Sequence, residues 1–145
     1  MEKISRSALV PYTNREMFAL VSDIESYPEF LPWCTEARVL SHEHDEVRAS
    51  IGFSVGGMTR TFDTRNYQQV NKMIEMQLVE GPFSDLRGYW QFDPLKSDNA
   101  CRVTLELEFE FAGRLISAAF GAVFNQVATS LVDAFCKRAD EVYRG

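Results

Sequence analysis

The hydrophobic period changes along this chain, and that change limits the folds open to it. Apolar and polar side chains alternate between residues 47 and 111, which is typical of long antiparallel strands with one dry face. From about Leu115 the period returns to 3.6 residues, which predicts one long helix from Leu115 to Tyr143, with Gly121 as a place for a bend or a close approach to the sheet. The clearest alternation puts one set of side chains on the dry face: Val103, Leu105, Leu107, Phe109 and Phe111.

The first third of the chain predicts a strand followed by short helices. Residues 4–10 alternate as a strand that ends near Pro11. Thr13 and Glu16 have the spacing of a capping box, which predicts a helix that runs to about Ser22. Turn-forming residues then divide the alternating region into strands, so that we expect about seven strands in all, joined at residues 44–46, 56–57, 70–72, 81–82 and 97–99.

The segment from Ser26 to Cys34 is rigid and unusually apolar. Pro28 and Pro32 each fix a backbone angle and restrict the preceding residue. Ser26 and Glu29 have capping-box spacing, which predicts a single helical turn over residues 27–31 that Pro32 ends. Such a segment holds its aromatic side chains over either the protein's own core or a bound apolar molecule.

Composition indicates a globular protein that does not bind nucleic acid wholesale. The chain has 46% hydrophobic and 25% charged residues and a net charge of −6. That charge argues against non-specific binding to DNA, RNA or an anionic membrane. The first residues lack the apolar stretch of a signal peptide, no run is long enough to span a membrane, and three cysteines lack metal-type spacing. We therefore expect a cytoplasmic protein with free thiols.

A strongly curved sheet around a helix leaves an apolar slot, because the helix fills only part of the concave face. Any one aromatic residue at an inward position is more simply explained as core packing. Taken together, the inward aromatics and the rigid segment predict a site for a lipophilic ligand. The candidate residues are Phe30, Leu31, Trp33, Phe53, Phe62, Phe83, Trp90, Phe92, Phe109, Phe120 and Phe124. The rigid segment and residues 80–83 would form the rim.

Other chemistry is less well supported by the sequence. His42 and His44 have no third metal ligand nearby, so we expect no metal site. The glutamates at positions 106, 108 and 110 alternate with the apolar face, which indicates a solvated surface rather than acid–base catalysis. The sequence places no general base near Cys34, so we interpret this cysteine as structural. The inward positions carry almost no acid or base, and we therefore expect no enzyme.

Six basic residues are the candidates for a local patch that binds ribosomal RNA. Positions 137, 138 and 144 lie near the end of the predicted helix, where the helix dipole alone would explain them. No aromatic residues are interleaved with these cations, as they would be in many RNA-binding surfaces. The candidates are Arg60, Arg65, Arg87, Lys137, Arg138 and Arg144.

At the level of families, the chain resembles the START-like superfamily, in particular its coenzyme Q-binding, polyketide cyclase-like branch. The resemblance runs from about Ile4 to Tyr143, and the proline segment and the Gly-Pro-Phe sequence are its most specific parts. The similar segments are residues 27–34, 61–65, 80–83, 88–92 and 109–111. Within the branch, the bacterial ribosome association toxins are especially similar, whereas mitochondrial members carry a targeting extension.

The resemblance implies a fold and two functions. The fold would be α+β of the helix-grip type: residues 1–145 as a single domain, with two short helices after the first strand and a curved antiparallel sheet of about seven strands around a long C-terminal helix. The first function is non-enzymatic binding of ubiquinone or a related polyprenyl quinone in support of respiration, with no cofactor required and at most transient membrane contact. The alternative is a toxin that binds the large ribosomal subunit and blocks subunit association, and a cyclase- or dehydratase-like enzyme is a third reading.

Overall fold

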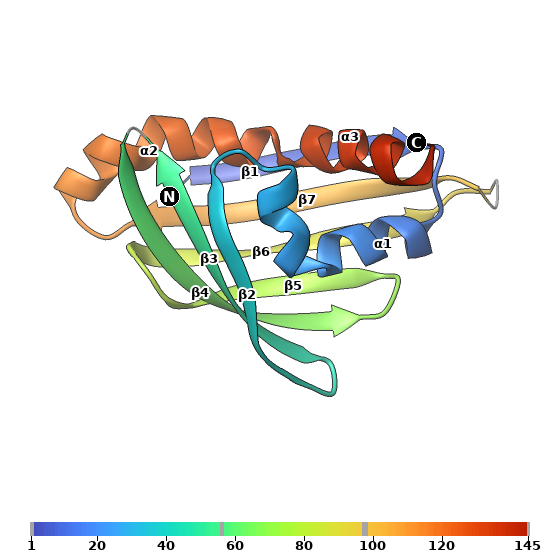
Figure 1. The fold of residues 1–145 in the computed structure, drawn as a ribbon, viewed down its shortest axis with the longest axis horizontal. Helices are drawn as coiled ribbons and strands as arrows, with labels where there is room; N and C mark the ends of the chain where they lie inside the picture. The colour runs from blue at the N-terminus through green and yellow to red at the C-terminus, as the bar shows by residue number, and fades with distance from the viewer. Residues whose placement is uncertain (1, 56, 97–98, 145) are drawn as a thin grey trace.

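The computed structural model describes residues 2–55, 57–96 and 99–144. Within them, seven strands form one antiparallel sheet in the order β1-β7-β6-β5-β4-β3-β2 (Figure 1). The strands are β1 (Glu2–Val10), β2 (Cys34–Glu43), β3 (Glu46–Val55), β4 (Met58–Gln69), β5 (Met73–Glu80), β6 (Phe83–Pro94) and β7 (Cys101–Phe111). The predicted α+β fold and its curved sheet are confirmed.

In the described ranges, four helical segments accompany the sheet. They are α1 (Asn14–Ser22), the 3₁₀ helix η1 (Ile24–Glu29), α2 (Arg114–Thr129) and α3 (Leu131–Tyr143). Since β1 pairs with β7, the chain leaves the sheet beside its first strand and returns across it as α2 and α3. α2 packs against β1, β3 and β7, and α3 packs against β1, β7 and α1. The apolar faces of the helices therefore cover one face of the sheet.

The helix α1 begins as predicted. The Glu16 N–H donates to Thr13 Oγ1 at 3.1 Å, and the Thr13 N–H donates to Glu16 Oε1 at 2.9 Å. This reciprocal pair satisfies two backbone donors that the first turn would otherwise leave unpaired. Met17, Phe18 and Val21 then point into the core.

The turn in the proline segment begins earlier than predicted. η1 starts at Ile24, so Ser26 lies inside it and does not cap it; the Ser26 hydroxyl donates to Asp23 Oδ2 at 2.6 Å. The predicted capping box of Ser26 and Glu29 is thus wrong. The end is close to the predicted one, because the Leu31 N–H still donates to the Tyr27 carbonyl at 2.9 Å before Pro32.

The hairpin turns lie where the sequence predicts them wherever the structure describes them. His44 (φ 55°) and Asn71 (φ 64°) adopt the left-handed conformation at two of these turns. Gly81 has φ 156°, and a Cβ there would lie 2.6 Å from the Phe62 Cβ, so only glycine fits. Gly56 and the turn positions 97 and 98 lie outside the described residues.

The C-terminal helix is broken, contrary to the single helix predicted over residues 115–143. α2 and α3 meet at Ser130 with a bend of 44°. The Thr129 hydroxyl donates to the Asn125 carbonyl at 2.7 Å and the Ser130 hydroxyl to the Val127 carbonyl at 2.8 Å. Side-chain hydrogen bonds of this kind compete with the helical ladder and bend it. Gly121, the predicted place for a bend, lies within α2.

Concerning the membrane, no single helix among the described residues is long and apolar enough to cross one. The bent pair of α2 and α3 meets that test on length and composition alone.

Candidate functional site

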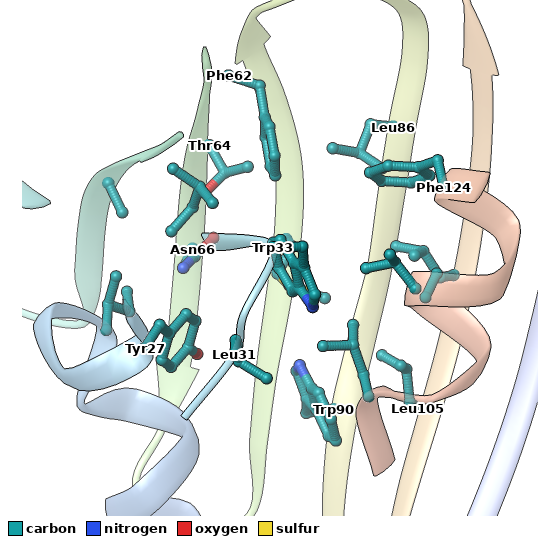
Figure 2. Close-up of a pocket in the computed structure, with 18 of the residues that line it drawn as sticks. Tyr27, Leu31, Trp33, Phe62, Thr64, Asn66, Leu86, Trp90, Leu105 and Phe124 are labelled. Atoms are coloured by element: carbon teal, nitrogen blue, oxygen red, sulfur yellow. The ribbon is translucent and has the colours of Figure 1, made fainter. Parts of the chain in front are cut away.

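An apolar cavity of about 110 Å³ lies between the sheet and the C-terminal helices (Figure 2). Three clusters of buried side chains meet around it. Its walls are Ile24, Tyr27, Leu31, Trp33, Ala49, Ile51, Phe62, Thr64, Asn66, Met76, Leu86, Trp90, Leu105, Leu107, Phe124, Val127, Ala128, Leu131 and Phe135. The volume exceeds the space for a single water, so the helices do not fill the concave face.

The two periodicities of the sequence produce these walls. On the sheet side, residues two apart share the inward face, as in Ala49 with Ile51 and Leu105 with Leu107. On the helical side, Phe124, Val127 and Ala128 belong to one face of α2, and Leu131 and Phe135 continue it in α3. The break at Ser130 therefore falls in the middle of the helical wall.

The loop after η1 supplies the third side of the cavity. The Cys34 N–H donates to the Leu31 carbonyl at 2.9 Å, and the Ser54 N–H donates to the Trp33 carbonyl at 2.9 Å. These bonds hold the indole of Trp33 over the space between β4 and α2. The Tyr27 hydroxyl donates to the Val21 carbonyl, and burial raises the pKa of this phenol. The rigid segment thus presents fixed, uncharged side chains to the cavity.

Among the predicted ligand-binding residues, the structure brings one group to the cavity and leaves another outside it. Leu31, Trp33, Phe62, Trp90 and Phe124 line it. The residues that do not line it are Phe30, Phe53, Phe83, Phe92, Phe109 and Phe120.

Most of the second group packs in an aromatic cluster under α2. The ring centroids of Phe53 and Phe120 lie 5.5 Å apart, and those of Phe109 and Phe124 lie 4.8 Å apart. Phe83 joins this cluster and is itself buried, so residues 80–83 reach the cavity only through Phe62. These residues face inward as predicted, but they fill the end of the concave face rather than lining a space.

Phe30 and Phe92 pack at the opposite end. Phe30 contacts Phe135 edge-on, with centroids 5.2 Å apart, and the Arg138 guanidinium lies 5.0 Å from its ring centroid. Phe92 packs against Phe18 at 5.7 Å. Both rings join helices to the rest of the core and do not border the cavity.

Sequence reasoning missed two polar residues of the cavity wall, Thr64 and Asn66. Both are 6% exposed and lie on β4, two and four residues after Phe62. The Asn66 Oδ1 atom is buried, and no described residue forms a hydrogen bond with it. Continuing the inward register of Phe62 by steps of two would have found them, but this strand alternates poorly and polar residues are rarely expected inside.

The candidate basic residues do not gather into one patch. Arg65 pairs with Glu46 at 2.7 Å, Arg87 with Glu108 at 3.3 Å, and Arg144 with Asp140 at 3.9 Å. Arg138 pairs with Glu29 at 3.5 Å, and the Arg60 guanidinium lies 6.0 Å from the Phe120 ring. Lys137 and Arg138 lie before the last turn of α3, so the helix dipole does not explain them.

The buried cysteines lack the properties of nucleophiles. Cys34 and Cys101 are buried, and burial raises the pKa of each thiol from 9.0 to about 11. The folded state favours the neutral thiol over the thiolate. The stabilisation that each neutral thiol contributes is therefore present below pH 9 and is lost as the pH rises through about 11.

Alkylation tests this assignment. In iodoacetamide at pH 8, we expect Cys34 and Cys101 to react at least about tenfold more slowly in the folded protein than in urea, since the thiolate is the reactive form. Mass spectrometry of peptides gives the rate at each site. If Cys34 reacts as fast in the folded protein as in urea, its structural role is wrong.

Comparison with known proteins agrees with the fold. The family described as polyketide cyclase / dehydrase and lipid transport matches residues 10–136. The ribosome association toxin RatA of Escherichia coli (strain K12) is 48% identical over 143 residues, which cover 99% of this chain and 90% of that protein. The mitochondrial coenzyme Q-binding protein COQ10 homolog B of Xenopus laevis is 26% identical, over 96% of this chain and 58% of its own length.

Solved structures share the architecture at low sequence identity. The ZhuI aromatase/cyclase from Streptomyces sp. R1128 has a TM-score of 0.82 at 14% identity, over 96% of this chain and 93% of that one. A START superfamily protein from Mycobacterium smegmatis has a TM-score of 0.76 at 19% identity, over 97% of this chain and 98% of that one. These neighbours confirm the START-like fold, and the match over residues 10–136 shows that this chain belongs to the polyketide cyclase / dehydrase and lipid transport family.

Proposed function

We propose that this protein binds a lipophilic molecule, ubiquinone or a related polyprenyl quinone, in the cavity between the sheet and the C-terminal helices. The observation that carries the proposal is the largely apolar cavity, whose walls include the indoles of Trp33 and Trp90 and the ring of Phe124. Burial of apolar ligand surface would supply the affinity, at roughly 25 cal/mol per Å² before the costs of binding. By the family resemblance, such a protein supports respiration.

The size of the cavity sets a condition on this function. At about 110 Å³ it is smaller than the roughly 300 Å³ at which small-molecule sites begin, so a quinone ring with part of its chain needs the walls to separate. The break at Ser130 lies within the helical wall, and Trp33 in the loop after η1 lines the same cavity. A shift of the helices at Ser130, or of the loop that carries Trp33, would widen the cavity without breaking the sheet.

The cavity wall also favours binding over catalysis. Among the described residues that line it, none carries a carboxylate, imidazole, amine or thiol. The Tyr27 hydroxyl is already bonded to a carbonyl, and burial raises its pKa further from neutrality. A cyclase or dehydratase would need a general acid or base within reach of its substrate. We therefore favour a binding protein rather than an enzyme.

Intrinsic fluorescence offers a direct test of quinone binding. The chain has two tryptophans, Trp33 and Trp90, and both line the cavity. Titration with decylubiquinone is expected to quench the fluorescence of both tryptophans until it saturates. In urea, the same titration is expected to give only the linear loss of fluorescence that collisions cause. Linear quenching in the folded protein would contradict the proposal.

Single substitutions distinguish residues that line the cavity from residues that pack around it. Trp33→Ala is expected to weaken decylubiquinone binding by about tenfold or more, since a ring of the cavity wall is lost. Phe30→Ala is expected to lower the free energy of unfolding by about 3 kcal/mol and to change affinity much less, because Phe30 packs on Phe135 outside the cavity. Quenching of tryptophan fluorescence measures both affinities, from Trp90 alone in Trp33→Ala and from both tryptophans in Phe30→Ala. Equal losses of affinity in the two variants would contradict the assignment.

A second candidate function is association with the large ribosomal subunit to block subunit joining. The name and 48% identity of the Escherichia coli relative favour it. The strand register also places several cationic residues in one row across the outer face of the sheet, and Glu108 and Gln77 lie between them in the same row. The cationic residues are Lys3, Arg87, Arg65 and Arg48. Carboxylates neutralise part of this row, so any RNA contact would be limited to a few phosphates.

Co-sedimentation tests the ribosomal candidate. If the row contacts RNA, the protein pelleted with purified large subunits at low salt is released as the salt concentration rises, because counterion release drives such contacts. Overexpression would also reduce polysomes in favour of free subunits. A protein that stays in the supernatant at low salt would contradict this second function.

A further inference from the structure

The cavity wall contains a polar group that the protein itself does not satisfy. Asn66 is 6% exposed, and its Oδ1 atom has no hydrogen-bond partner among the residues that the structure describes. The residues opposite Asn66 on the neighbouring strands are Val47 and Met76, whose side chains carry no group that donates a hydrogen bond to an oxygen. Figure 2 shows the Asn66 amide on the sheet wall beside Thr64, which is equally buried.

An unpaired buried amide destabilises the folded state. Its hydrogen bonds with water are lost on folding, and no group in the described part of the chain replaces them at Oδ1. Leucine has nearly the same shape and would fit an apolar wall without this cost. Residues that violate the packing rules in this way are typical of functional sites, where a ligand supplies the missing partner.

We propose that Asn66 receives the polar end of the ligand, so that the cavity selects an apolar molecule that ends in a hydroxyl or carbonyl oxygen. A hydroxyl donates to Oδ1, and a carbonyl accepts from the Nδ2 group of the same amide. Thr64 adds a hydroxyl that serves in either role. The apolar remainder then lies toward Trp90, Phe124 and the helical wall. This inference rests on the proposed binding function and adds the orientation of the ligand.

A pair of matched probes tests the inference. p-Cresol and p-xylene are nearly the same size and differ in one hydroxyl, and the indole N–H resonances of Trp33 and Trp90 report the occupation of the cavity by either. Asn66→Leu is expected to raise the ratio of the p-cresol Kd to the p-xylene Kd by roughly three- to tenfold, the value of one hydrogen bond. It is also expected to raise the Tm of the ligand-free protein.

Two further variants make the result decisive. Ser50→Ala removes a buried hydroxyl from β3 outside the cavity and is expected to leave the ratio unchanged. Asn66→Ala is a second variant in which the same rise in the ratio is expected, so that misfolding of one variant does not remove the test. A ratio that stays the same in both Asn66 variants overturns the inference, and so does wild-type protein that binds neither probe. The proposed function is judged separately by the decylubiquinone titration.

Discussion

Replacing Ala49 by leucine is expected to weaken quinone binding by at least about 100-fold while the protein stays folded. Ala49 is 1% exposed and lies on the sheet wall of the cavity. The added carbons occupy the space that the ligand needs. Because they fill an existing void, the free energy of unfolding is expected to rise by up to about 2 kcal/mol, at about 0.8 kcal/mol per buried methylene. Tryptophan quenching by decylubiquinone and urea denaturation measure the two effects.

A matched substitution outside the cavity gives the control. Ala139 on α3 is fully buried, but it does not line the cavity. Ala139→Leu therefore adds the same carbons to a closely packed core and is expected to lower the free energy of unfolding by about 1 to 3 kcal/mol. If Ala49→Leu destabilises the protein as much as Ala139→Leu does, or binds quinone normally, the space beside Ala49 is not the ligand site.

The second large effect is expected for Phe135→Ala, which should lower the free energy of unfolding by about 3 to 5 kcal/mol. Phe135 is 1% exposed. Its ring lies 5.2 Å from those of Phe30 and Trp90 and 5.4 Å from that of Tyr27, all edge-on. Phe135 of α3 thus contacts both the rigid segment (residues 26–34) and the sheet. Since domains of this size are stable by about 5 to 15 kcal/mol, the variant would be close to unfolding.

Urea denaturation measures this loss, and the same helix provides its control. Val142 is 46% exposed, so Val142→Ala is expected to change the free energy of unfolding by no more than about 0.5 kcal/mol. A loss below about 1 kcal/mol in Phe135→Ala would mean that α3 is not held to the rigid segment through this ring.

The sequence predicts the layers of this fold well because each layer has a distinct period. Alternation over residues 47–111 requires strands with one dry face, and the stripe after Leu115 requires helix to cover that face. Turn positions such as Asn71 and Gly81 also follow from local backbone chemistry. These features depend on residues close together in the chain, so a single sequence contains them.

The features that the sequence did not predict have different physical causes. The helix breaks at Ser130 and not at Gly121, because hydroxyl groups compete with the helical ladder there. Phe53 and Phe109 face inward as expected, but whether an inward ring lines a space or fills it depends on α2 above it. Asn66 was not predicted as a cavity residue, because its polar side chain occupies an inward position where an apolar residue is expected.

Native mass spectrometry of freshly purified protein, followed by solvent extraction, tests the binding of a lipophilic molecule most directly. We expect the wild-type protein to carry a molecule with the mass of a polyprenyl quinone, and the Ala49→Leu variant, purified in parallel, to lack it. Wild-type protein that carries no such molecule, and that binds no added quinone, would contradict the proposed function.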